Sequence, residues 1–206
     1  MQQIETKHYI LRIPKLEDAE EIYERWGTDK ENMAQYKEHS LYKNIIETKA
    51  LIIAAIKETE YGVIFWIIED KKTSKIIGYI KLSSGIIKHK KREVSFYFLE
   101  GYREKKTPEE VLRGVIDYIF TEEEYETIIM KFYAADKNDT DLLNRILLEI
   151  GMTREGILRN RLINDEGKKI DKYIYSILKE EWETNKTKIC LRLHPFDWSE
   201  KIENLT

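Results

Sequence analysis

The stretch that decides the fold is Glu93-Val94-Ser95-Phe96-Tyr97-Phe98-Leu99-Glu100-Gly101-Tyr102-Arg103-Glu104-Lys105-Lys106-Thr107-Pro108-Glu109-Glu110. Its first seven residues are dense in aromatic and aliphatic side chains, which is typical of a strand. The pattern at Thr107, Pro108 and Glu110 predicts a helix start, with an N-cap threonine, proline at the first helical position and a glutamate that completes a capping box. A strand, a loop and a helix therefore follow one another here.

The helix that begins at Thr107 extends to about Phe120, and a second apolar strand follows near Ile128 to Ala134. A helix between two strands is typical of a crossover connection, which joins parallel strands. We therefore predict a β-α-β unit at the centre of the fold.

An antiparallel hairpin is predicted before this unit. Tyr61–Glu69 and Lys75–Leu82 are strand-like, and the polar residues Asp70–Ser74 form the turn between them. The basic run Lys88–Arg92 then leads into the next strand. We interpret it as a solvated hairpin loop rather than as a patch for an anionic partner.

The N-terminal part of the chain predicts one strand and two helices. His8–Ile13 is a short apolar strand, Pro14 interrupts it, and Leu16–Trp26 has helical spacing. Asn44–Lys57 predicts a second, largely buried helix with Asn44 as its N-cap.

The C-terminal part predicts a helix and a hairpin. Asp141–Ile150 is amphipathic and stops at Gly151, the residue type that most often ends a helix in the left-handed conformation. Met152–Ile163 and Lys168–Leu178 then flank the hairpin-turn residues Asp-Glu-Gly.

The domain is expected to span residues 1–183, with 184–206 as a C-terminal extension. Within the extension, Lys188–Leu193 alternates polar and apolar residues, which predicts an edge strand. Such a strand would pair with its own sheet or with a partner subunit, so a homodimer is one arrangement left open, and a flexible addition is the alternative.

Composition narrows the functional classes. The 206 residues, 42% of them apolar, are enough for one domain with a core. Basic and acidic residues number 35 and 38, which argues against a nucleic-acid-binding protein. A single cysteine, apolar runs too short to cross a membrane and the lack of a signal-peptide pattern predict a cytoplasmic protein. The spacing of the four histidines predicts no metal site.

Several motifs carry a resemblance to a known family. They are Glu5–Arg12 followed by Glu17-Asp18-Ala19, Ile77-Gly78, Glu93–Tyr97, and Glu155-Gly156 with Arg159, Asp171 and Tyr175. Between about Ile4 and Trp182 the chain resembles the GNAT N-acetyltransferases, in the RimJ/RimL-like branch; position 8 departs, being histidine where that branch has arginine. The resemblance implies an α+β fold with a mixed, twisted sheet of about seven strands and about four helices. It also implies that the fourth and fifth strands splay apart to admit the pantetheine arm of acetyl-CoA.

The pyrophosphate loop departs from the family pattern. Where the family has Gly-x-Gly, this chain has Glu104-Lys105-Lys106, and Pro108 removes one backbone donor. Glutamates near the loop would repel a diphosphate, while Arg103 and the two lysines would attract it. The resemblance implies that the cofactor is held by Phe98, Leu99, Arg103, Glu104, Lys105, Lys106, Thr107 and Thr140, although helix capping alone is an alternative role for Thr140.

Acetyl transfer to an amine requires a base, a donor for the thioester oxygen and an acid for the thiolate. The resemblance implies Glu93 as base; a surface ion pair with Arg92 is the alternative. A backbone N–H near Phe98 to Leu99 would meet the oxygen. Tyr175 is a candidate acid, or a packing residue.

Two functions are thereby predicted. The first is an N-acetyltransferase that moves the acetyl group of acetyl-CoA, by direct attack, to a primary amine of a small molecule or a protein N-terminus. The alternative is a catalytically silent GNAT-fold binding or regulatory protein that has lost normal acetyl-CoA binding.

Overall fold

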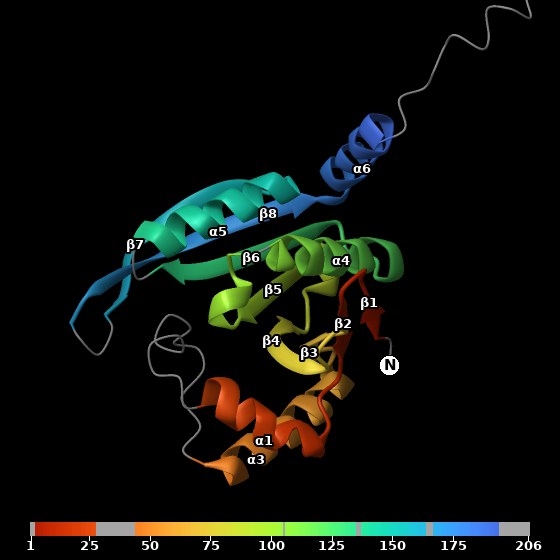
Figure 1. Ribbon diagram of the computed structural model, residues 1–206. Coiled ribbons are helices and arrows are strands. Elements are labelled where there is room, and N and C mark those ends of the chain that lie inside the picture. The colour runs from red at the N-terminus through yellow and green to blue at the C-terminus, as the bar shows by residue number, and fades with distance from the viewer. Residues whose placement is uncertain (1–2, 28–43, 105, 135–136, 164–166, 194–206) are drawn as a thin grey trace, which may run out of the picture.

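The computed structural model describes residues 3–27, 44–104, 106–134, 137–163 and 167–193. They form an α+β fold in which one mixed sheet of eight strands carries helices on both faces (Figure 1). This confirms the predicted fold class, with one strand more than expected.

The strand bounds are β1 (Ile4–Glu5), β2 (Tyr9–Arg12), β3 (Ile64–Asp70), β4 (Lys75–Leu82), β5 (Lys91–Phe98), β6 (Thr127–Ala134), β7 (Thr153–Ile163) and β8 (Lys169–Leu178). Their order in the sheet is β1-β2-β3-β4-β5-β6-β8-β7. Neighbouring strands are antiparallel except β5 and β6, which are parallel. The predicted β-α-β unit and both predicted hairpins are therefore confirmed.

The described α-helices are α1 (Ala19–Ile22), α3 (Ile45–Glu58), α4 (Thr107–Glu122), α5 (Lys137–Ile150) and α6 (Lys179–Leu193). Asn44 caps α3 as predicted, because its Oδ1 accepts hydrogen bonds from the backbone N–H groups of Ile46 and Glu47, each at 3.0 Å. Gly151 ends α5 with a φ of 103°, also as predicted.

Two apolar clusters occupy the two faces of the sheet. Val94, Phe96 and Phe98 of β5 pack in the larger cluster, together with the buried face of α4. Tyr97 points to the other face, where it belongs to a smaller cluster with residues of α1 and α3. In Figure 1, α1 and α3 accordingly lie on the side of the sheet opposite α4.

Three sequence-based predictions about burial and secondary structure were wrong. Helix α3 is mostly exposed, since only Thr48 and Ile52 are buried in it, and the Ile46 side chain is 74% exposed. The basic run is not fully solvated, because Arg92 is buried and its guanidinium approaches a carboxylate oxygen of Glu123 at 3.4 Å. The predicted edge strand 188–193 belongs to helix α6 instead.

Helix α6 also contains the predicted boundary after residue 183. It begins directly after β8 and packs on α4, where Trp182 donates a hydrogen bond from Nε1 to Asp117 at 3.3 Å. Lys186 pairs with the same carboxylate. Residue 183 therefore lies within this helix, and the division of the chain after it stays a prediction.

Candidate active site

The parallel strands β5 and β6 part before they end. Their pairing runs from Lys91 opposite Thr127 to Val94 opposite Met130. Strand β5 continues to Phe98 and remains paired with β4, and β6 continues to Ala134 and remains paired with β8. The sheet therefore opens between β5 and β6 beyond Val94, as the family resemblance implied.

Backbone donors point into this opening. The N–H groups of Leu99 and Ser83 donate to the carbonyls of Ile77 and Glu93, at 2.9 and 3.0 Å. Antiparallel strands alternate their hydrogen bonding, so odd-numbered residues of β5 bond to β4 and even-numbered residues turn toward β6. The N–H groups of Phe96 and Phe98 thus face the gap. The backbone N–H groups of Phe98 and Leu99 were the two predicted donors to the thioester oxygen. That of Leu99 is already hydrogen-bonded within the sheet, to the Ile77 carbonyl.

Glu93 lies at the edge of the opening, on the sheet face opposite α4. Its carboxylate pairs with Lys131 of β6 across a distance of 2.5 Å, and its side chain is 37% exposed. Arg92, the partner suggested by the sequence, points to the other face, toward Glu123. Glu93 is thus reachable from solvent, and its cationic partner is Lys131 rather than the neighbouring Arg92 that the sequence suggested.

Two more polar side chains lie on the same open face. Tyr133 of β6 and Lys172 of β8 are directly opposite in the antiparallel register. The Lys172 ammonium donates to the Tyr133 hydroxyl at 3.1 Å and lies 4.7 Å from its ring centre. The alternation of β6 offered a signal for Tyr133, because Met130 and Phe132 are buried while the odd-numbered positions Lys131 and Tyr133 carry polar groups.

The loop between β5 and α4 is anchored from inside. Arg103 is buried, its Nε donates to the carbonyl of Phe98 at 2.9 Å, and its guanidinium lies 5.8 Å from the ring centre of Tyr97. This cation was expected to attract a diphosphate. In the structure it holds the loop against the end of β5.

The remaining loop residues are more open. Glu104 and Lys106 are exposed, and Lys105 lies outside the described residues. A glycine does occur in this loop, at Gly101, where φ is 41° and an added Cβ would meet nothing within 4 Å. Gly101 thus supplies one position of positive φ, three residues before the place where the family has its first glycine.

The start of α4 uses its polar groups within the protein. Thr107 is the first residue of the helix rather than its N-cap, and its hydroxyl shares a buried 2.7 Å hydrogen bond with that of Tyr9. Glu110 does not complete a capping box. Its carboxylate accepts from the backbone N–H of His8 and pairs with the His8 ring, both at 2.7 Å.

Glu109 is likewise paired, with Arg113 at 3.0 Å. Its carboxylate therefore opposes an incoming diphosphate less than the sequence suggested, since a neighbouring cation offsets part of its charge. Thr140 lies within α5, which begins at Lys137, so the capping role considered for it is wrong.

Tyr175, the candidate acid, is fully buried on the other face of the sheet from Glu93. It stacks on Phe132 with ring centres 5.9 Å apart, and its hydroxyl donates to Asn144 of α5. Burial raises the pKa of Tyr175, against the opposing effect of Arg154. These contacts favour the packing role.

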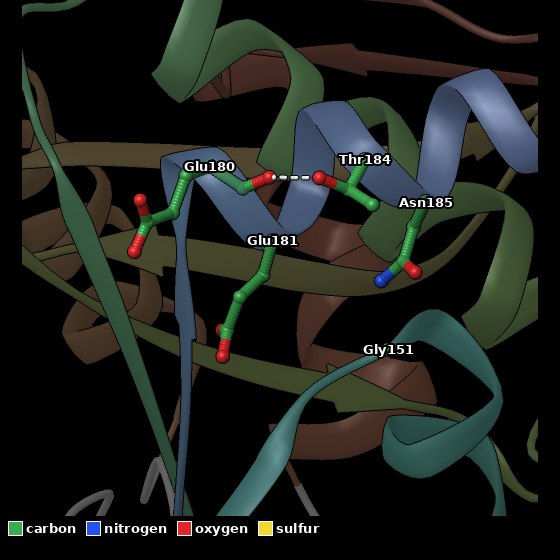
Figure 2. A pocket seen from close by; sticks show the side chains of 5 residues that line it. All are labelled: Gly151, Glu180, Glu181, Thr184 and Asn185. Carbon is green, nitrogen blue, oxygen red and sulfur yellow. Dashed lines mark hydrogen bonds between the residues drawn. The ribbon is translucent and has the colours of Figure 1, made fainter.

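A pocket of about 460 Å³ lies elsewhere, between the end of α5 and the start of α6 (Figure 2). Gly151, Glu180, Glu181, Thr184 and Asn185 line it. None of these residues belongs to the β5–β6 opening.

Within the described ranges, no group of histidine, cysteine or acidic side chains is arranged to hold a metal ion. In the same part of the chain, none of the helices combines the length and apolar character needed to cross a membrane.

Comparison with known proteins decides the family. The family model described as "Acetyltransferase (GNAT) domain" matches residues 8–152, which include the β5–β6 opening and the loop before α4. This chain belongs to the GNAT acetyltransferases. Its family membership makes this protein an acetyltransferase, and acetyl-CoA is the acetyl donor that the family uses.

Individual relatives agree with the family assignment. An uncharacterised N-acetyltransferase, YoaA, of Bacillus subtilis (strain 168) is 28% identical over 178 residues, which are 85% of this GNAT chain and 96% of YoaA. The ribosomal-protein-S5-alanine acetyltransferase of Vibrio fischeri superposes with a TM-score of 0.73 at 18% identity, covering 88% of this chain and 99% of the other.

The microcin C7 self-immunity acetyltransferase MccE, solved with acetyl-CoA and AMP, superposes with a TM-score of 0.69 at 21% identity. The match covers 84% of this chain and 93% of MccE. Both structures share the GNAT fold with this protein.

The residues of this GNAT chain fit an acyl-CoA at the opening. The backbone donors of Phe96 and Phe98 are turned toward the gap, which suits the oxygen and amide groups of a thioester arm. The exposed Lys106 beside the loop suits a phosphate, whereas Glu104 opposes it. Bound there, acetyl-CoA would supply an activated acetyl group for transfer.

Proposed function

We propose that this chain is an acetyl-CoA-dependent N-acetyltransferase whose acceptor is a primary amine bound on the open face of β5, β6 and β8. The observation that carries the proposal is the opening beyond Val94 and Met130, with backbone donors directed into it and Glu93 at its edge. An acyl donor in the gap and an amine beside Glu93 would approach each other from the two sides of one site.

The chain's own groups divide the work of direct acetyl transfer. The N–H of Phe98 or Phe96 donates to the thioester oxygen, where negative charge develops as the amine attacks. Glu93 accepts the proton that the acceptor's ammonium must lose before its nitrogen can act as a nucleophile. Solvent reaches Glu93, so a water molecule can carry this proton as well.

The name of one structural relative gives its acceptor, the alanine of a ribosomal protein, and that of another gives a role in self-immunity to microcin C7. We infer that the acceptor of this chain is a protein α-amine, as in the first of these relatives, or the amine of a small molecule. The open face can admit both, because Glu93, Lys131 and, on β8, Lys172 are only partly buried there.

Isothermal titration of the protein with acetyl-CoA tests the first part of the proposal, and thiol release in a panel of amines tests the second. The panel contains peptides with free α-amines, the same peptides with blocked α-amines, and small primary amines. Binding followed by amine-dependent thiol release supports the proposal. Binding without release from any amine, or no binding, would favour the catalytically silent alternative.

A further inference from the structure

The pair formed by Lys131 and Glu93 places an amine of the protein itself at the proposed acceptor position. Lys131 is the first residue of β6 beyond the last residue paired with β5, so its backbone borders the opening. Its ammonium contacts the carboxylate of Glu93 at 2.5 Å, the group expected to accept a proton from an acceptor.

The Lys131 ammonium can also reach the gap. Consecutive strand residues advance by about 3.3 Å, so the N–H of Phe96 lies about two residue lengths beyond Val94, where the strands part. A lysine side chain has a flexible stem of four carbons, and that of Lys131 is 28% exposed. Its amine can swing from Glu93 toward the opening without movement of the backbone.

We propose that Lys131 is an acetyl acceptor within its own active site, so that the protein acetylates itself at this lysine. The inference rests on the proposed function, because it needs acetyl-CoA bound in the β5–β6 opening.

The proposed transfer exchanges two protons of the Lys131 ammonium for one acetyl group. The Lys131 ammonium gives one proton to Glu93, which passes it to solvent, and the neutral nitrogen attacks the thioester carbonyl carbon. The N–C bond forms, the C–S bond breaks, and the electron pair leaves with the sulfur. A second proton leaves the nitrogen and ends on the sulfur, so the products are N-acetyl-Lys131, the free CoA thiol and one proton.

Self-acetylation would also change the site. Acetyl-lysine carries no charge, so it cannot form an ion pair with Glu93. The Glu93 carboxylate would then be available to the ammonium of another acceptor.

The test begins with purified full-length protein and acetyl-CoA, after titration calorimetry has measured binding. Intact-mass spectrometry should show the addition of one acetyl group, and peptide mapping should place it on Lys131. The rate per molecule should not change with protein concentration, because the reaction is intramolecular. Lys131→Arg should abolish the addition, and Glu93→Gln should slow it by about 100-fold.

A matched control is Lys71, which forms a similar ion pair with Glu5 at 3.2 Å at the far side of the sheet. Acetyl-CoA should modify Lys131 at least about tenfold faster than Lys71, whereas a rate governed by exposure alone would be similar for the two lysines. Acetic anhydride provides a readout that does not depend on the active site. With this reagent Glu93→Gln should speed the labelling of Lys131, since the carboxylate no longer holds the ammonium, whereas with acetyl-CoA it should slow it.

Failure of this inference is distinguishable from failure of the proposed function. If acetyl-CoA binds but Lys131 is modified no faster than Lys71, or Glu93→Gln changes both reagents' rates alike, self-acetylation is excluded and the proposed function stands on its other tests. If calorimetry detects no acetyl-CoA binding, both proposals are excluded together.

Discussion

The hydroxyl groups of Tyr9 and Thr107 share a buried hydrogen bond of 2.7 Å, which ties β2 to the first residue of α4. This contact connects the N-terminal edge of the sheet to the helix that follows the proposed cofactor loop. It gives the Thr107 hydroxyl a structural role inside the protein, at a position where the sequence suggested a cofactor contact.

Thr107→Val keeps the shape of the side chain and removes its hydroxyl. We expect the free energy of unfolding to fall by about 1–3 kcal/mol, because the buried Tyr9 hydroxyl loses its partner. Acetyl-CoA affinity should stay within about twofold by calorimetry, since the buried hydroxyl is engaged with Tyr9. Thr121→Val is the control, as Thr121 is exposed and bonds only within its helix. A large loss of affinity with unchanged stability would restore Thr107 as a cofactor ligand.

Glu110 should contribute a pH-dependent part of the stability. Burial raises its pKa, but hydrogen bonds from His8 and Thr6 outweigh this effect and hold the pKa of Glu110 below its ordinary value. A carboxyl group with a lowered pKa in the folded state stabilises the protein above its unfolded pKa, and this contribution is lost as the pH falls through the folded pKa. Denaturant melts of Glu110→Gln should therefore show a loss of about 1–2 kcal/mol at pH 7 and a smaller loss at an acid pH below the lowered pKa. An equal loss at both pH values would contradict the charge-based explanation.

The altered loop should weaken acetyl-CoA binding, because Glu104 adds a negative charge and the family's glycine positions carry side chains here. Replacing Glu104 and Lys106 together by glycine should tighten binding by about three- to tenfold, as backbone N–H groups gain access to the diphosphate. Calorimetry at two salt concentrations measures the change. Glu124→Gly, an exposed substitution beyond the far end of α4, should leave affinity unaltered. Unchanged or weaker binding by the double variant would place the diphosphate elsewhere.

Glu93→Gln should lower turnover of a verified amine at neutral pH by about 100-fold or more, since general-base contributions have that size. Acetyl-CoA binding should stay nearly unchanged, because the carboxylate lies on the acceptor side of the gap. Glu126→Gln removes a comparable but exposed glutamate–lysine pair with Lys90 and serves as control. Equal turnover by Glu93→Gln and the wild type would remove Glu93 from the mechanism.

Gly151→Ala should destabilise the turn between α5 and β7. The φ of Gly151 is 103°, and an added Cβ would meet the side-chain nitrogen of Asn185 at 2.4 Å. We expect a loss of about 1–3 kcal/mol in thermal or denaturant melts. Asn185→Ala in the same chain should recover the part that comes from the clash. Gly156→Ala, where nothing lies within 4 Å, should cost less than about 1 kcal/mol.

Much of the fold could be predicted from local sequence patterns. The capped start of α3 at Asn44 and the glycine end of α5 at Gly151 were both predicted, because each depends on a single residue and its neighbours. The parallel pairing of β5 and β6 followed from the helix between them. The alternation of polar and apolar residues at 188–193 predicted a strand, which was wrong, because these residues directly continue the helix that starts at Lys179.

The candidate site was only partly predictable. Glu93 and the donor near Phe98 came from the family pattern, and the structure puts both beside the opening. The partner of Glu93 could not be predicted without the strand register, because Lys131 lies 38 residues away from it in the chain. Lys172 and Tyr133 were missed for the same reason, because only pairing of β6 with β8 brings them together.

The sequence by itself determined the order of the strands and helices, the crossover that makes β5 and β6 parallel, and the family. These depend on side-chain periodicity, capping residues and short motifs, which act over a few neighbouring positions. The tertiary structure decided which charges meet: Glu110 turns to His8 instead of capping α4, Arg103 anchors the loop, and Lys131 reaches Glu93. Charged side chains find partners across strands and helices, so their roles are set by which elements pack together.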